Sequence, residues 1–164
     1  MSKREEGNYP TRDLFIETLV KLGGKYLIKS EVSSEFDIKF KFSECRFMAN
    51  VTNSSYDIDI WFPDWLHVDW DDNDTCAYVT KLVNDLNFGL KSKFFYTIHE
   101  EENLIRLHNS ISFQLLSNIP NIEEYMSGKL NQLISEQQMF IQEMENLKEQ
   151  MLLSNTECNQ GEAN

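Results

Sequence analysis

The sequence predicts an α+β fold, in which an antiparallel sheet made of a three-strand meander and a hairpin packs with helices in the order α-β-β-β-α-β-β-α. Apolar and polar residues alternate three times between Glu35 and Trp70, which is typical of strands with one buried face. Before and after this stretch, apolar residues recur every three or four positions, which is typical of amphipathic helices. The chain has 164 residues and a hydrophobic fraction of 41%, enough for one domain with its own core.

Residues 1–10 are mostly polar and charged, and we expect a flexible N-terminus there. A first helix is predicted to begin at Pro10-Thr11, where the Thr11 side chain can cap it. Gly23-Gly24 is expected to end this helix, because glycine is favoured just beyond a helix C-terminus. The apolar stripe of the helix consists of Phe15, Ile16, Leu19, Val20 and Leu22. Residues 25–32 are predicted to be extended and to lead into the meander.

The meander has short, polar connections at Ser43-Glu44 and from Thr52 to Ser55, so its neighbouring strands must be antiparallel. Its apolar face consists of Phe36, Ile38, Phe40, Phe42, Cys45, Phe47, Ala49, Val51, Tyr56, Ile58, Ile60 and Phe62. Pro63 follows directly and has no backbone donor for a strand ladder. We therefore expect Pro63 to break the third strand or to bend it at a sheet edge.

A second helix is predicted after the acidic run from Asp71 to Asp74, with Asn73 or Asp74 as its N-cap. Its apolar face consists of Val79, Leu82, Val83 and Leu86, and it stops at Asn87 to Gly89. A hairpin follows, with alternating strands at residues 92–99 and 104–113 and a charged turn between them.

The last predicted helix begins after Pro120, where Asn121 and Glu124 have the spacing of a capping box. Its apolar stripe consists of Ile122, Met126, Leu130, Leu133, Phe140, Met144, Leu147 and Met151. About 30 helical residues extend roughly 45 Å, which exceeds the width of a domain of this size. Part of the helix must then overhang the body of the domain or contact something else. We place the domain at residues 11–152 and a disordered tail at residues 153–164.

No residue pattern predicts catalysis, a metal site or a cofactor. His67, His99 and His108 lie far apart on strand-like segments, without the spacing of a zinc site. The run from Asp69 to Asp74 lacks the glycine and the distal glutamate of a calcium loop, so helix capping explains it better. The chain also lacks a glycine-flanked nucleophile and a phosphate-binding loop. We therefore expect a protein that is not an enzyme.

The net charge of −12 argues against a nucleic-acid partner, whose phosphates require clustered Lys and Arg. We expect no membrane partner and a cytoplasmic location, because the sequence has neither a long apolar run nor a signal peptide. Cys45, Cys76 and Cys158 lack disulfide or zinc spacing and are interpreted as free thiols. The acids between Asp57 and Asp74 favour a cationic or apolar partner at that edge, or serve only solubility.

Two groups of apolar residues are candidates for binding. Met48 and Trp61 lie on the faces of their strands that should be polar, with Trp65 and Trp70 nearby in sequence, so Met48, Trp61 and Trp65 are candidate partner contacts. The alternative is that a helix covers this face. The stripe Phe140, Met144, Leu147 and Met151 is a candidate seam for homodimerisation or for a partner helix. The alternative is that it folds back on the sheet.

The order of elements, the segment with Phe62, Pro63 and Trp65, the acidic cap of the second helix and the end of that helix at Asn87 resemble the YbjN-type family of proposed bacterial sensory transduction regulators. That family is similar in fold to the class I chaperones of type III secretion, which are acidic homodimers that hold an extended segment of a partner. The resemblance covers residues 11–150 and implies an α+β sandwich with a protein-binding role and no catalytic residue.

From the residues and this resemblance we expect a non-enzymatic protein- or peptide-binding module, chaperone-like or regulatory, that forms a homodimer. A small-molecule sensor or an enzyme with a pocket between the sheet and the second helix is the alternative.

Overall fold

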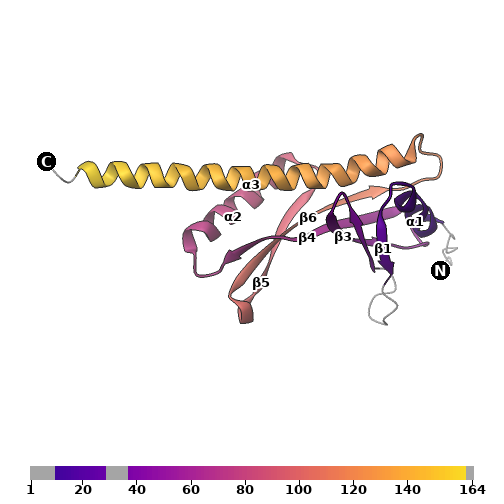
Figure 1. The fold of residues 1–164 in the computed structure, drawn as a ribbon, viewed down its shortest axis with the longest axis horizontal. Helices are drawn as coiled ribbons and strands as arrows, with labels where there is room; N and C mark the ends of the chain where they lie inside the picture. The colour runs from indigo at the N-terminus through magenta and orange to yellow at the C-terminus, as the bar shows by residue number, and fades with distance from the viewer. Residues whose placement is uncertain (1–9, 29–36, 162–164) are drawn as a thin grey trace, which may run out of the picture.

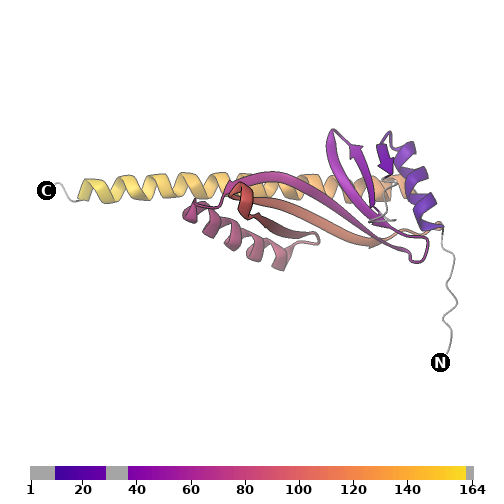
Figure 2. The ribbon, with the colours of Figure 1, turned by 90° about the horizontal axis from the view of Figure 1, so that it is seen from below.

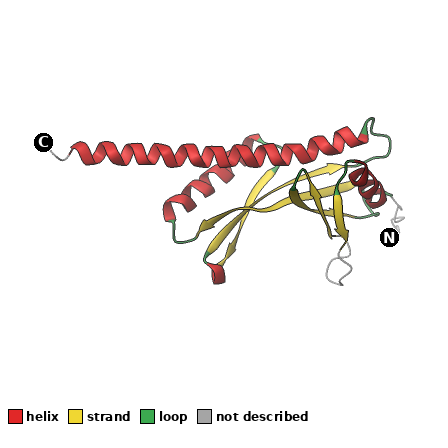
Figure 3. Ribbon diagram, in the orientation of Figure 1, coloured by secondary structure: helices red, strands yellow, loops and turns green. Residues whose placement is uncertain are grey.

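The computed structural model of the protein describes residues 10–28 and 37–161. Its elements are α1 (Thr11–Lys21), β1 (Lys25–Ile28), β2 (Asp37–Phe42), β3 (Cys45–Val51), β4 (Asp57–Asp69), α2 (Asn73–Gly89), β5 (Lys93–His99), the short 3-10 helix η1 (Glu100–Glu102), β6 (Leu104–Gln114) and α3 (Ile122–Gly161). Figures 1 and 3 show a twisted sheet with α3 lying along it. The predicted α+β class is confirmed, and the order of elements matches the prediction except that β1 forms an additional strand before the meander and η1 lies within the hairpin. Some of the predicted features lie outside the described residues. They are residues 1–9 of the expected N-terminus, part of the predicted extended segment, and Phe36.

The strands form one six-stranded antiparallel sheet in the order β1-β2-β3-β4-β6-β5. The predicted meander corresponds to β2, β3 and β4, and the predicted hairpin to β5 and β6. The two longest strands, β4 and β6, pair along most of their length at the centre of the sheet. In Figure 2 the β2–β3 hairpin turns away from this long central pair. Most of the buried side chains of β2 to β6 are hydrophobic and stand at alternate positions, so they point to the same side and give the sheet an apolar face.

The buried side chains form two clusters on that apolar face. The first core consists of Phe15, Leu19, Ile38, Phe40, Phe47, Ala49, Val51, Ile58, Ile60, Phe62, Ile111, Phe113, Leu115, Met126, Leu130 and Leu133. The second core consists of Val68, Val79, Leu82, Val83, Phe94, Ile105, Leu107, Phe140 and Met144. Helix α1 covers the first core, α2 covers the second, and α3 contributes to both. Leu107 and Ile111 share one face of β6, so all three helices lie on the same side of the sheet.

Helix α3 joins the two cores, and Figure 1 shows it running along the whole length of the sheet and beyond. Between its two apolar stretches, the core-facing position is held by Glu136, which is buried. The helix continues to Gly161, past residue 152 where we expected the domain to end. Within the described part of the chain, no helix is both long and apolar enough to cross a lipid bilayer.

We expected Pro63 to break the third strand of the meander or to bend it at a sheet edge. Instead, β4 continues past Pro63 to Asp69, and it lies in the middle of the sheet. The register between β4 and β6 shifts between Phe62 and Leu66, so three residues of β4 lie opposite His108 alone. This is a bulge, and Asp64 within it has a φ of 54°. The bulge accommodates the missing donor of Pro63, and Trp65 packs against residues of both cores.

The helix ends follow local chemistry, with two corrections to the predicted caps. Helix α1 ends in a Schellman motif, in which the N–H of Gly23 (φ 75°) donates to the Val20 carbonyl and that of Gly24 donates to the Leu19 carbonyl. Thr11 does not cap α1, because it is the first helical residue and Pro10 holds the N-cap position. The N-cap of α2 is Asp72, not Asn73 or Asp74.

The Asp72 carboxylate accepts a hydrogen bond of 3.0 Å from the Thr75 N–H. Hydrogen bonds from Thr75 lower the pKa of this carboxyl group.

Candidate functional site

The face of the sheet opposite the helices, here called the open face, carries a line of apolar side chains that no described helix covers. Met48 on β3 lies directly opposite Trp61 on β4. The Trp61 ring meets the ring of Phe95 from β5 edge to face, with 5.6 Å between the centroids. Trp61 is 46% exposed, and the other two are half-buried. We call these three residues the aromatic strip. It brings together two consecutive strands, β3 and β4, and the more distant strand β5.

His108 on β6 supports the strip from within the sheet. The Phe95 ring stacks on the His108 imidazole at 5.1 Å between centroids, and His108 is only 7% exposed. Its Nδ1 accepts a hydrogen bond of 3.1 Å from the backbone N–H of Asp64 in the bulge. Its Nε2 lies 2.9 Å from the Thr97 hydroxyl oxygen. Because Nδ1 is an acceptor, the proton of the neutral ring sits on Nε2, which donates to Thr97.

Burial lowers the pKa of His108, because the charged imidazolium would lose its hydration. The Asp64 carboxylate, 3.7 Å from Nδ1, acts in the opposite direction. The positive charges of His99, Arg106 and His67 have smaller effects, and each lowers the pKa further. The neutral ring is therefore the form that fits the observed hydrogen bonds. These bonds hold the imidazole in place, and the Phe95 ring stacks on it.

The three histidines lie on the open face, where His99 and His108 share a partner and His67 is one strand away. Thr97 contacts both His108 and His99, whose Nε2 lies 3.1 Å from the same hydroxyl oxygen. His67 on β4 lies opposite Arg106 of β6, which is also opposite Thr97 of β5. Sequence reasoning missed this grouping, because it depends on the strand register. Within the described ranges, no group of three His, Cys, Asp or Glu side chains has the arrangement of a metal site.

The structure places the other candidate residues on the helical side. Trp65 is half-buried, and its ring lies 5.3 Å from that of Phe140 and 6.2 Å from that of Phe94, centroid to centroid. Phe140 is fully buried, Met144 is buried in the second core, and Leu147 packs against that core. The side chain of Met151 lies outside the described residues. Phe140 and Met144 therefore pack against the sheet, which was the alternative to a dimer seam. A seam formed by the rest of the stripe stays a prediction.

A buried polar group separates the two cores under α3. The Glu136 carboxylate accepts hydrogen bonds from the Ser92 hydroxyl and from Gln132 Nε2, the latter at 2.8 Å. Asn109 of β6 donates from Nδ2 to the Leu133 carbonyl at 3.0 Å. The bond from Asn109 ties α3 to β6 and that from Ser92 ties it to the residue before β5, whereas the Gln132 bond lies within α3. The carboxylate is occupied by its partners, so its role in this arrangement is structural.

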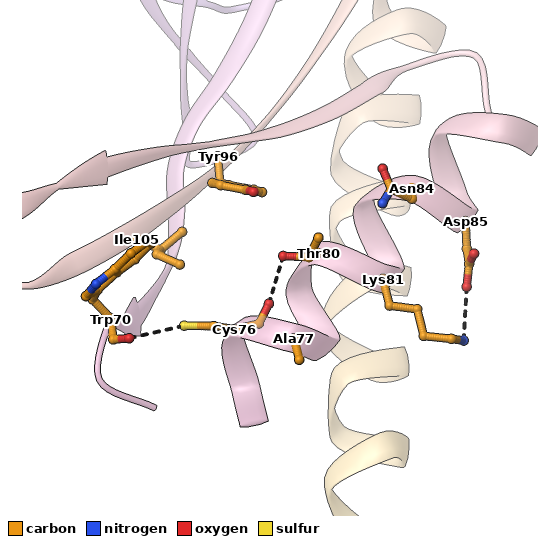
Figure 4. A pocket seen from close by; sticks show the side chains of 9 residues that line it. All are labelled: Trp70, Cys76, Ala77, Thr80, Lys81, Asn84, Asp85, Tyr96 and Ile105. Atoms are coloured by element: carbon orange, nitrogen blue, oxygen red, sulfur yellow. Dashed lines mark hydrogen bonds and ion pairs between the residues drawn. The ribbon is translucent and has the colours of Figure 1, made fainter. Parts of the chain in front are cut away.

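An open groove of about 600 Å³ lies between α2 and the sheet (Figure 4). This is the place where a small-molecule sensor or an enzyme, the alternative function, would need a pocket. It is lined by Trp70, Cys76, Ala77, Thr80, Lys81, Asn84, Asp85, Tyr96 and Ile105. Burial raises the pKa of the Cys76 thiol, and the carboxylate of Asp72 raises it further. Lys81 pairs with Asp85 at 3.1 Å. The raised pKa of Cys76 keeps its thiol protonated and so does not activate it as a nucleophile.

Of the comparisons with known proteins, the one with solved structures supports the fold. No family model and no curated protein matches the chain. Among solved structures, the chain is similar to the crystal structure of YbjN, described as a proposed transcription regulator from E. coli, with a TM-score of 0.56 and 14% sequence identity. The match covers 85% of this chain and 94% of that chain. The protein therefore has a YbjN-like fold, as its element order indicated, and at this identity the similarity extends to the fold alone.

Proposed function

We propose that this protein is a non-enzymatic protein- or peptide-binding module that holds its partner on the open face of the sheet. The observation that carries the proposal is the aromatic strip of Met48, Trp61 and Phe95 on a face that no described helix covers. Trp and Met are enriched at protein interfaces, and a Trp side chain contributes a large contact area at a low cost in conformational entropy. Trp61 is half exposed near the centre of the sheet, so a bound partner can bury its side chain further.

The free edge of β4 offers a second way to hold a partner segment. Strand β3 stops pairing with β4 at Trp61, whereas β6 continues to pair with it as far as Asp69. The β3-facing edge of the strand from Leu66 to Asp69 therefore has no neighbouring strand within the described ranges. An extended peptide that adds to such an edge gains main-chain hydrogen bonds. This edge lies on the same strand as Trp61, five residues further along and beyond the bulge, so an extended segment can reach both features.

The sharpest test compares two exposed tryptophans. Peptides selected from a random display library on the wild-type protein should bind Trp61→Ala at least about tenfold more weakly, since anchor residues commonly contribute that much. They should bind Trp70→Ala as they bind the wild type, because Trp70 is equally exposed but lines the groove beside α2. Selected peptides that depend on Trp70 and not on Trp61 would contradict the proposal.

We propose in addition that the protein is a homodimer, with the part of α3 beyond the second core as the contact. The support is the length of α3, which extends past the elements that it packs against (Figure 1). Light scattering should give a dimer for the full chain and a folded monomer for a chain that ends at Gln150. That truncation point keeps Phe140 and Met144 in place. A monomeric full chain would exclude this contact.

The alternative is a small-molecule sensor or an enzyme that uses the groove in Figure 4. The groove has suitable apolar walls in Trp70, Tyr96 and Ile105, which is the observation in its favour. The solved structure of similar fold is described as a regulator and not as an enzyme. An NMR screen of small molecules would separate the two functions. Shifts confined to Cys76, Thr80 and Tyr96 would favour the groove.

A further inference from the structure

We propose that the partner segment is acidic on one side of its apolar anchor, and that its carboxylates lie over a row of basic side chains beside the aromatic strip. This inference rests on the proposed function and specifies the chemistry of the partner. The row consists of Lys25 on β1, Lys41 on β2 and Arg46 on β3, and we call it the basic row.

The strand register places the basic row on the open face. Lys25 lies directly opposite Lys41, and Lys41 lies directly opposite Arg46. All three side chains are exposed. Arg46 precedes Met48 by two residues on β3, so both point to the same face. Lys39 lies opposite Met48 and adds a fourth positive charge next to the strip.

This grouping of cations has an energetic cost that the described part of the chain does not offset. Like charges directly opposite each other on antiparallel strands destabilise the pair. The chain has 15 Lys and Arg against 27 Asp and Glu, so negative side chains are plentiful. Yet within residues 10–28 and 37–161 the ion pairs involve Lys21, Lys81, Arg106 and His108, and none involves a cation of the basic row. An acidic partner would supply the missing negative charge.

The sign of the charge changes across the strip, which gives the bound segment a direction. On β4, Asp57 and Asp59 lie on the other side of Trp61, where Asp59 is opposite Asn50 of β3. A peptide can confine its carboxylates to the side of the basic row and keep neutral or basic residues near Asp59. A single-stranded nucleic acid has a phosphate at every nucleotide, so it would also meet these aspartates and the net charge of −12. The observations therefore favour an acidic peptide.

The test is a selection of random display peptides on the full-length protein, with counter-selection on Trp61→Ala. We expect the enriched peptides to combine an aromatic or aliphatic residue with a net negative charge. The double variant Lys41→Glu/Arg46→Glu should bind them at least about tenfold more weakly, as loss of complementary charge commonly does. The control Lys81→Glu/Lys91→Glu changes the net charge equally at exposed positions outside the open face, and it should retain their affinity. Raising the salt concentration should weaken binding to the wild type.

The outcomes separate this inference from the proposed function. Peptides that depend on Trp61 but are neutral or basic would overturn the acidic partner and leave the binding face intact. A selection that yields no Trp61-dependent peptide would overturn both. A labelled single-stranded oligonucleotide that binds at near-physiological salt, and loses its affinity in Lys41→Glu/Arg46→Glu, would replace the acidic peptide by a nucleic acid.

Discussion

The two faces of the sheet use the same alternating strands for different purposes. On the covered face, Phe94 contacts Trp65 and Phe140, and α2 and α3 close over it. On the open face, Trp61 contacts Phe95, and no described helix lies above them. An aromatic side chain on the first face contributes to folding, whereas one on the second face is available for the binding that we propose. Substitutions on the two faces should therefore separate stability from binding.

The largest effect is expected for Phe140→Ala on the covered face. Phe140 is fully buried, so its loss removes apolar contacts and leaves a cavity, at a cost of about 3–5 kcal/mol in the free energy of unfolding. Urea denaturation followed by circular dichroism measures it. Phe88→Ala, at a side chain that is 97% exposed in α2, is the control and should change the stability by less than about 0.5 kcal/mol. Similar values for both variants would mean that α3 does not pack on the second core.

The next effect is expected for the polar group between the cores. Glu136→Ala removes the acceptor of the buried Ser92 hydroxyl, which should cost about 1–3 kcal/mol. Glu136→Gln keeps an acceptor and should cost less. A double-mutant cycle with Ser92→Ala measures the coupling between the two side chains. A coupling energy of zero would show that the two groups do not interact in solution.

The open face should make stability depend on pH through His108. Its pKa is lowered in the folded protein, so on acidification the unfolded chain binds a proton first, near the ordinary value of 6.5. Stability is fully present above that pH and is lost as the pH falls toward and through the lowered folded pKa. Denaturation curves at several pH values should show a smaller loss for His108→Asn than for the wild type. Parallel losses would assign the effect to other groups.

The smallest effect on stability is expected for Trp61→Ala. The side chain is half exposed, and its loss removes an aromatic contact worth about 0.5–1.5 kcal/mol. We expect a decrease in the free energy of unfolding near the lower end of that range, together with the loss of peptide binding described above. A decrease as large as that of Phe140→Ala would mean that the strip is part of the core, and the contrast between the faces would fail.

Much of the fold could be predicted from local patterns. The alternation around Ile38, Phe47 and Ile60 specified strands with one buried face, and short polar turns specified their antiparallel pairing. The outward position of Met48 and Trp61 also followed from this period of two. These features depend on neighbours in sequence, so the sequence alone was sufficient. The contribution of Phe95 to the strip was missed, because it lies on a strand that pairs only with β6.

Other features depended on which elements become neighbours in space. The stripe of Phe140 and Met144 has the same spacing whether it covers a sheet or a second helix, and only the position of α3 over the second core decides between them. The bulge at Pro63 shifts the register of β4, which sets Trp65 among the core residues and Asp64 against His108. The basic row likewise exists only through the pairing of β1, β2 and β3. Periodicity determines which way a side chain points along its own element, whereas its partner depends on packing between elements distant in sequence.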